Sequence, residues 1–269
     1  MSMYKNNRPL ILVSNDDAYF AKGLQCLIAC VQKFGDIVVV APATPMSGKS
    51  HSITSDFPLR ATLVEDANCL KFYKVDGTPA DCVKLALNQL LDRRPDLVVA
   101  GINHGDNTSV SVLYSGTMGA TMEACLHGIP SVGFSLCEHS HAADFSHAMP
   151  HIERIVERLL DKGLPKNVCL NINFPKGKIR GVKVGRQGEG EWVEEFDKRY
   201  DPKATEYYWL TGRFESRESR NNSPWGKSSE PDIELIDEGY ASIVPVNIDM
   251  TDYSMIETMK KNGWELGQG

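Results

Sequence analysis

Features that would place this chain in a membrane or a secretory pathway are missing from its 269 residues. No apolar run reaches the roughly 18 to 20 residues that a helix needs to cross a bilayer. The first ten residues, MSMYKNNRPL, lack the apolar segment that is typical of a signal peptide. The sequence therefore predicts a cytoplasmic protein without membrane contact.

An excess of positive charge and paired cysteine motifs are also missing. The net charge of −6 argues against binding to a nucleic-acid polymer, because such proteins usually carry basic patches. A small anionic substrate remains compatible with this charge if a metal ion supplies local positive charge. The seven cysteines form no CxxC pair, which predicts reduced, mostly buried thiols and neither a disulfide framework nor a zinc site.

What is present at the N-terminus is an apolar run that ends abruptly in acidic residues. The run 9–13 predicts a buried strand, and apolar residues at helical spacing predict a helix over 21–34. Between them lies Asn15-Asp16-Asp17, where a dinucleotide-binding enzyme would carry GxGxxG. A dinucleotide-dependent oxidoreductase is therefore disfavoured.

Strands and helices continue to alternate through about residue 175, which predicts an α/β fold with a mostly parallel sheet flanked by helices. Further strands are predicted at 36–42, 59–63, 71–75, 96–101, 129–135 and 168–174, and further helices at 80–91, 117–127 and 145–161. Thr78 is expected to cap the helix after residue 78, with Pro79 at its first position and Asp81 compensating its dipole.

The last third of the chain is richer in β-strand patterns and in polar residues. Strands are predicted at 182–184, 187–196, 207–214, 233–235 and 239–246, a polar loop or hairpin at 215–231, and a helix at 253–264. Such an arm has little core of its own and commonly packs on a second subunit, so we expect a homo-oligomer. We predict one domain over 1–269, with a core at about 8–175, an arm at about 176–235, and a returning strand and helix at about 236–265.

Oxygen-bearing side chains gather in the loops that follow the predicted strands. Asp16 and Asp17 follow the first strand, Ser47 the second and Asn103 a later one. In open α/β sheets these loops meet at one edge, where ligands bind. Carboxylate, hydroxyl and amide oxygens suit Mg²⁺ or Mn²⁺. Taken alone, Asn15-Asp16-Asp17 could equally be a solvated turn with an aspartate cap.

A second element of the predicted site is Ser115-Gly116-Thr117, which opens a helix. Free backbone N–H groups and the helix dipole make such a start suitable for an anion, although an ordinary capping motif would also explain Thr117. A hard cation beside an anion site indicates metal-assisted hydrolysis of a phosphate ester.

The chain resembles the SurE family of metal-dependent survival-protein nucleotidases from about Pro9 to Asp252. The resemblance is carried by the strings SNDD, APATPMSGKSHSIT, DGTPADCV, GINHGDN, YSGTMGATMEA, NINFP and GYASIVPV. It implies a Rossmann-like core with a β-hairpin arm exchanged in a dimer, often within a tetramer. It also implies hydrolysis of nucleoside 5′- and 3′-monophosphates, with some members cleaving short polyphosphate.

The resemblance also assigns roles to single residues. The metal ligands for one Mg²⁺ or Mn²⁺ per subunit fall on Asp16, Asp17, Ser47 and Asn103, with Asp16 and Asp17 as the catalytic pair. The phosphate contacts fall on Ser115, Gly116 and Thr117, with Asn15 and Asn107 close by. The sequence does not decide whether a metal-activated water or an aspartate attacks phosphorus. His51 and His104 are both candidates for the general acid.

One position departs from the family pattern. The family usually has glycine after Asn-Asp-Asp, and here Ala18 stands there. If this position has a positive φ, alanine costs about 1 kcal/mol relative to glycine. Both carboxylates are retained, so we expect activity. The alternative is a catalytically impaired module of the same fold that binds only nucleotide or metal.

Overall fold

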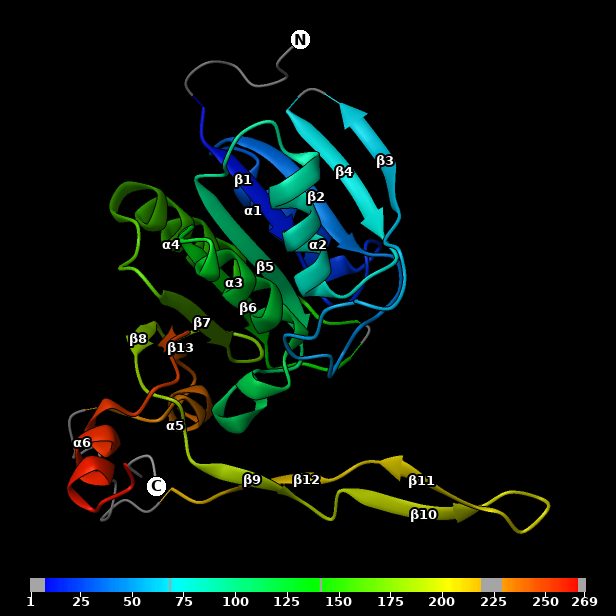
Figure 1. The fold of residues 1–269 in the computed structure, drawn as a ribbon. Helices are drawn as coiled ribbons and strands as arrows, with labels where there is room; N and C mark the ends of the chain where they lie inside the picture. The colour runs from blue at the N-terminus through cyan, green and yellow to red at the C-terminus, as the bar shows by residue number, and fades with distance from the viewer. Residues whose placement is uncertain (1–7, 68, 141, 219–228, 266–269) are drawn as a thin grey trace.

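The computed structural model describes residues 8–67, 69–140, 142–218 and 229–265. Its centre is a nine-stranded sheet with the strand order β3-β4-β2-β1-β5-β6-β7-β13-β8 (Figure 1). In chain order these strands are β1 (Leu10–Ser14), β2 (Asp36–Pro42), β3 (Ala61–Ala67), β4 (Leu70–Val75), β5 (Leu97–His104), β6 (Ser131–Leu136), β7 (Val168–Phe174), β8 (Val182–Val184) and β13 (Ala241–Asn247).

Helices cover both faces of this sheet and make a three-layer molecule (Figure 1). The helices of the layers are α1 (Lys22–Val31), α2 (Pro79–Leu85), α3 (Gly116–Leu126) and α4 (Met149–Lys162). Successive side chains of a strand point to opposite faces, so Ile11 of β1 joins one apolar core and Leu12 joins the other. Both faces are covered, which is why β1 is apolar throughout.

The predicted α/β fold with a mostly parallel sheet is confirmed. Strand β1 pairs in parallel with β2 on one side and with β5 on the other. The chain therefore reverses the direction in which strands are added at the β1–β5 boundary. In open α/β sheets this switch point is where a crevice forms beyond the carboxyl ends of the strands.

Local capping signals place the helices near that crevice. Thr78 and Asp81 form the capping box of α2, and Pro79 is its first residue, as predicted. The helix was predicted to run to residue 91, but α2 ends at Leu85 and a π-helical turn, η1 (Ala86–Leu90), follows. Ser115 caps α3, its hydroxyl accepting a hydrogen bond from the Met118 N–H at 3.1 Å.

Other predicted elements also differ from the structure. Residues 233–235 were predicted to be a strand and instead belong to α5 (Asp232–Asp237), because Asp232 and Leu235 are buried at a helical spacing of three residues. Strand β5 extends to His104, so Asn103 is part of the strand and not of a loop. The helix predicted from residue 145 begins only at Met149.

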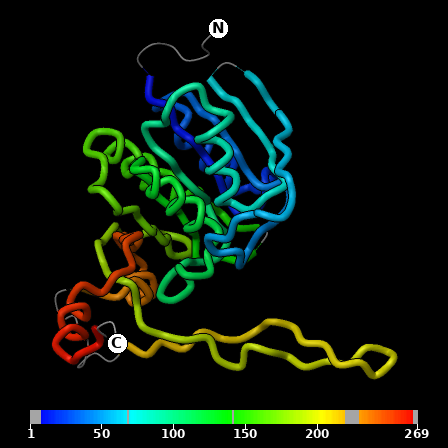
Figure 2. The backbone as a smooth tube through the Cα atoms, viewed as in Figure 1, coloured from blue at the N-terminus to red at the C-terminus, as the bar shows by residue number. Residues whose placement is uncertain are grey.

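The β-rich arm lies outside the three layers (Figure 2). It consists of β9 (Gly190–Val193), β10 (Phe196–Tyr200), β11 (Glu206–Leu210) and β12 (Arg213–Ser216). Two short helices complete the structure: η2 (Ser109–Leu113) lies between β5 and α3 in the chain, and α6 (Tyr253–Lys261) follows β13. The predicted strands 187–196 and 207–214 are each divided in two, and β10 pairs with β11 while β12 pairs with β9. Most of the predicted polar loop 215–231 lies outside the described residues.

Among the helices of the described residues, none is both long and apolar enough to cross a membrane.

Candidate functional site

Asp16 follows β1 and lies against the start of α3. It is 3% exposed, and its Oδ1 accepts a hydrogen bond of 2.6 Å from the Thr117 hydroxyl. Gly116 is equally close, because a Cβ added there would lie 2.8 Å from the Asp16 Cβ. Burial and the neighbouring charge of Asp17 raise the pKa of Asp16 to about 6. The predicted carboxylate and the predicted anion site are thus in direct contact.

Asp17 connects the ends of β1 and β5 across the switch point. Its Oδ2 accepts a hydrogen bond from the backbone N–H of His104 at 3.0 Å and lies 3.2 Å from the His104 Nδ1. Asn103, the preceding residue, donates its Nδ2 to the carbonyl of Gly105 at 2.9 Å. This hydrogen bond fixes the amide plane, so that its oxygen is the end that remains for a ligand.

Ser47 lies in the loop after β2, which we name the Ser47 loop (residues 43–53). The preceding residue, Met46, donates its backbone N–H to the Asp16 carbonyl at 2.7 Å. Ser47 itself is exposed. The backbone therefore brings all four predicted metal ligands, Asp16, Asp17, Ser47 and Asn103, to neighbouring positions at the switch point.

Asn15 closes the turn that carries the two aspartates. Its Nδ2 donates to the carbonyl of Ala18 at 2.9 Å, while its Oδ1 is buried without a hydrogen-bond partner. Ala18 has a φ of 78°, the conformation that favours glycine. Alanine therefore carries the expected strain at this position, but Asp16 and Asp17 keep their contacts with Thr117 and His104.

Asn107 belongs to a buried network of polar side chains. Its backbone N–H donates to Asn173 Oδ1 at 2.7 Å, its carbonyl accepts from Asn171 Nδ2 at 2.7 Å, and its own Nδ2 donates to Ser135 Oγ at 2.8 Å. Asn107 thus holds its loop to β6 through its side chain and to β7 through its backbone. Asn171 and Asn173 had no predicted role. The signal in the sequence that could have identified them is the occurrence of two asparagines, two residues apart, in an otherwise apolar strand.

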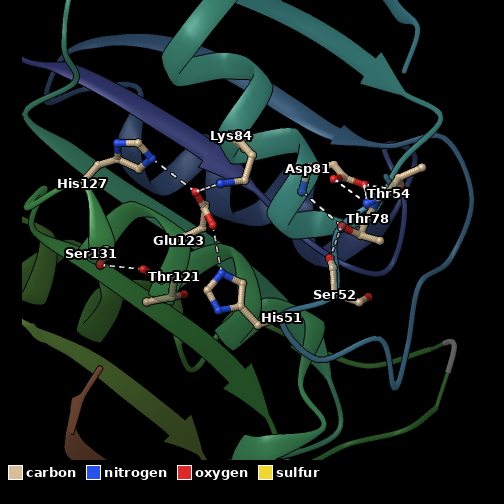
Figure 3. Close-up of polar contacts among 10 residues, drawn as sticks. All are labelled: His51, Ser52, Thr54, Thr78, Asp81, Lys84, Thr121, Glu123, His127 and Ser131. Carbon is tan, nitrogen blue, oxygen red and sulfur yellow. Dashed lines mark hydrogen bonds and ion pairs between the residues drawn. The ribbon is translucent and has the colours of Figure 1, made fainter. Parts of the chain in front are cut away.

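The two candidate general acids lie in different surroundings. The Nε2 of His51 lies 3.0 Å from a carboxylate oxygen of Glu123 (Figure 3). His104 contacts Asp17 directly. Of the two candidates, His104 is therefore the one in contact with a predicted metal ligand. Glu123 had no predicted role, although it is the single charged residue in the sequence of α3.

Asp232 holds the root of the arm to the loop after β5. It is fully buried at the start of α5, and it accepts hydrogen bonds from the backbone N–H groups of Ser109 at 3.0 Å and Gly188 at 2.9 Å. Burial raises its pKa to about 6 despite these hydrogen bonds, and the charge of Asp106 adds to the effect. Asp232 had no predicted role, because the sequence around it is typical of the end of a polar loop.

Asp232 is expected to make the stability depend on pH. Because the pKa of Asp232 is higher in the folded than in the unfolded chain, protonation of its carboxyl stabilises the folded protein. This contribution is fully present below about pH 4 and is lost as the pH rises through about 6. Urea unfolding in EDTA at pH 4.5 and pH 7.5 should show a smaller pH-dependent loss for Asp232→Asn than for the wild type, by about 2 kcal/mol. An unchanged pH dependence would show that Asp232 titrates normally.

The residues at the switch point fit a hard divalent cation. Two adjacent carboxylates repel each other, and this repulsion adds to burial in raising the pKa of Asp16. The buried, unpartnered oxygen of Asn15 is a further acceptor beside them. The described residues contain no group of three or more His, Cys, Asp or Glu that could hold a metal. The predicted ligand set differs from such a group, because it has only two carboxylates and is completed by the hydroxyl of Ser47 and the amide oxygen of Asn103.

Comparisons with known proteins agree on one family. The model of the family described as "Survival protein SurE" matches residues 11–194. The protein named 5′-nucleotidase SurE of Phocaeicola vulgatus is 46% identical over 97% of this chain and 99% of its own, and that of Bacteroides fragilis is 46% identical over 97% and 100%. The crystal structure of the SurE protein from Aquifex aeolicus superposes with a TM-score of 0.77 at 33% identity, covering 94% of this chain and 99% of its own.

Proposed function

The chain belongs to the survival protein SurE family and is an enzyme of the 5′-nucleotidase type, and we propose from this premise that it hydrolyses nucleoside 5′-monophosphates, and also 3′-monophosphates, with one divalent cation. The observation that carries the proposal is the contact between the Asp16 carboxylate and Thr117 at the start of α3. A cation ligand and an anion site are adjacent there, as the transfer of a phosphoryl group requires.

In this proposal Asp16, Asp17, Ser47 and Asn103 would hold one Mg²⁺ or Mn²⁺. The cation would supply positive charge that stabilises the phosphoryl oxygens during P–O cleavage. The backbone N–H groups of residues 115–117 would bind the same oxygens at the positive end of the helix dipole. Asn15 and Asn107 would then act by shaping the loops around the phosphate, since their Nδ2 groups already donate to Ala18 and Ser135.

The test is release of phosphate by the purified protein. AMP, GMP, CMP, UMP and 3′-AMP should each be offered with Mg²⁺, with Mn²⁺ and with EDTA. We expect release that depends on the metal and is abolished by EDTA, and the ranking of substrates will define the specificity. Nucleotide binding without release under any condition would favour the module that only binds, and Ala18→Gly would then be the first variant to examine.

We further propose that the arm is exchanged between two copies of the chain in a dimer, alone or within a tetramer. Its support is the set of large side chains that the arm exposes, such as Trp209 at 62% and Leu210 at 70%. Helix α6 likewise buries none of its side chains. Uncovered apolar groups of this size usually mark an interface.

Removal of the arm tip should abolish the oligomer. Sedimentation velocity of the full chain should give a dimer or tetramer, and a variant in which a short Gly-Ser link replaces residues 196–210 should give a monomer. A full chain that sediments as a monomer at micromolar concentration would refute arm exchange.

A further inference from the structure

A buried carboxylate outside the predicted site joins three separate elements. Glu123 of α3 is 2% exposed. One of its oxygens lies 3.0 Å from Nε2 of His51, and the other lies 2.6 Å from Nζ of Lys84 and 3.2 Å from Nε2 of His127 (Figure 3). Lys84 comes from α2, His127 from the end of α3 itself, and His51 from the Ser47 loop.

These contacts keep Glu123 negatively charged. Burial alone would raise the pKa of this carboxyl, but hydrogen bonds from His51 and Lys84 outweigh burial and lower the pKa to about 2. Glu123 is therefore an acceptor at neutral pH, and the Nε2 of His51 is the donor. Hydrogen bonds to a charged, buried group are stronger than those between neutral groups. The His51 contact is thus a firm tether.

His51 is the side chain that joins the Ser47 loop to the buried Glu123. Its neighbours are also held, because the Ser50 hydroxyl donates to the Leu113 carbonyl at 2.6 Å and the Ser52 carbonyl accepts from the Thr78 hydroxyl at 2.7 Å. The loop backbone is held at Met46, which donates to the Asp16 carbonyl at 2.7 Å, and at Ser50, which donates to the Tyr114 carbonyl at 3.0 Å. Ser47 lies between these two points, four residues before His51. A tether at His51 therefore restricts where the Ser47 backbone can move.

The helix that carries Glu123 is the same one that contacts Asp16. Its first residues include Thr117, whose hydroxyl lies 2.6 Å from Asp16 Oδ1. A single helix therefore holds the catalytic carboxylate at its N-terminus and the Ser47 loop through Glu123, two turns further along. Gly119 lies between them, and a Cβ there would approach the Ser50 carbonyl oxygen to 2.2 Å.

We propose that Glu123 is a positioning residue which, through His51, fixes the Ser47 loop on α3 and so holds Ser47 beside Asp16 and Asp17. The consequence for the metal rests on the proposed function, whereas the fixing of the loop does not. Groups that orient metal ligands typically contribute about 10- to 100-fold to metal affinity. Lys84 balances the charge of Glu123. Among the described residues, neither Lys84 nor His127 forms a hydrogen bond or ion pair with the Ser47 loop.

The first experiment measures Mn²⁺ affinity directly, by calorimetry on metal-free protein without substrate. His51→Ala should weaken binding by about 10-fold or more. His51→Gln should retain most of the affinity, because the glutamine Nε2 can still donate to Glu123. His127→Ala is the matched control, since it removes a bond to the same carboxylate from a residue outside the loop, and it should change the affinity less than about twofold. Equal losses in the two alanine variants would overturn the proposal.

The second experiment reads the loop without any metal. Amide hydrogen exchange in EDTA should be at least several-fold faster at Lys49, Ser50 and Ser52 in His51→Ala than in His127→Ala, because these three N–H groups are hydrogen-bonded in the tethered loop. Unchanged exchange in His51→Ala would overturn the proposal. Asp16→Ala is expected to bind no Mn²⁺. If the wild type also bound no Mn²⁺, the proposed metal site would be refuted. The exchange data would still decide whether Glu123 fixes the loop.

Discussion

Replacement of Asp16 by asparagine is expected to reduce kcat/KM for nucleoside monophosphates by about 1,000-fold or more, since a cation ligand is typically worth several kcal/mol in the transition state. Asparagine keeps the size of the side chain, and its oxygen can still accept the hydrogen bond from Thr117. What is lost is the negative charge. The measurement is steady-state turnover with saturating Mn²⁺.

The same variant should be as stable as the wild type at pH 7.5, or more stable. Because burial raises the pKa of Asp16 to about 6, the ionised carboxylate is unfavourable in the folded protein without metal, and the neutral amide removes that cost. Activity and stability are thus predicted to move in opposite directions, which a merely structural residue would not show. Urea unfolding in EDTA measures the stability.

Asp232→Asn is the matched control for this comparison. Asp232 is also buried, and its pKa is likewise raised to about 6, but it contacts Ser109 and Gly188 and not α3. Its turnover should fall no more than a few-fold. If Asp16→Asn retained turnover within about tenfold of the wild type, the assignment of Asp16 as a metal ligand would be untenable.

The parts of the site that follow from local rules were predictable from the sequence. An apolar run that ends at Asp16 and Asp17 predicts a buried strand with an acidic end, and the parallel pairing of β1 with β2 and β5 then places that end at the switch point. Thr78 likewise marks the start of a helix, because its side chain satisfies an N–H group three residues on. The cap of α3 was misplaced, because the helix was predicted from residue 117 and the structure starts it at Gly116 with Ser115 as the cap.

The parts that depend on distant partners were not predictable. Asp232 reads as a polar loop residue until Ser109 and Gly188, more than 40 positions away in the chain, are known to surround it. Glu123 had no predicted role, because His51 and Lys84, which contact it, come from two other elements. The spacing of apolar residues indicates whether a segment is a helix or a strand, but it does not show which charged residues the fold brings to a buried carboxylate.

Gly119→Ala should have the second-largest effect, although alanine is the better helix former. Helix propensity favours alanine by about 1 kcal/mol. The added Cβ, however, would lie 2.2 Å from the carbonyl oxygen of Ser50, 2.9 Å from its carbonyl carbon and 3.1 Å from the Cα of His51. All three are backbone atoms, so no side chain can rotate away. Crowding of this kind costs about 1–3 kcal/mol and is relieved only if the Ser47 loop moves off α3.

Displacement of the loop by about 1 Å is expected to lower kcat/KM by about 100-fold, because Ser47 would move with it. The unfolding free energy should fall by no more than about 2 kcal/mol, since the loop can move without opening the core. Gly181→Ala is the matched control: its Cβ would meet nothing closer than the Tyr240 ring at 3.6 Å, so turnover and stability should be unchanged. Turnover and stability are compared for both variants under the same conditions. A Gly119→Ala variant that gained stability and kept full turnover would mean that the Ser47 loop does not rest on α3, and the tether through Glu123 would lose its physical basis.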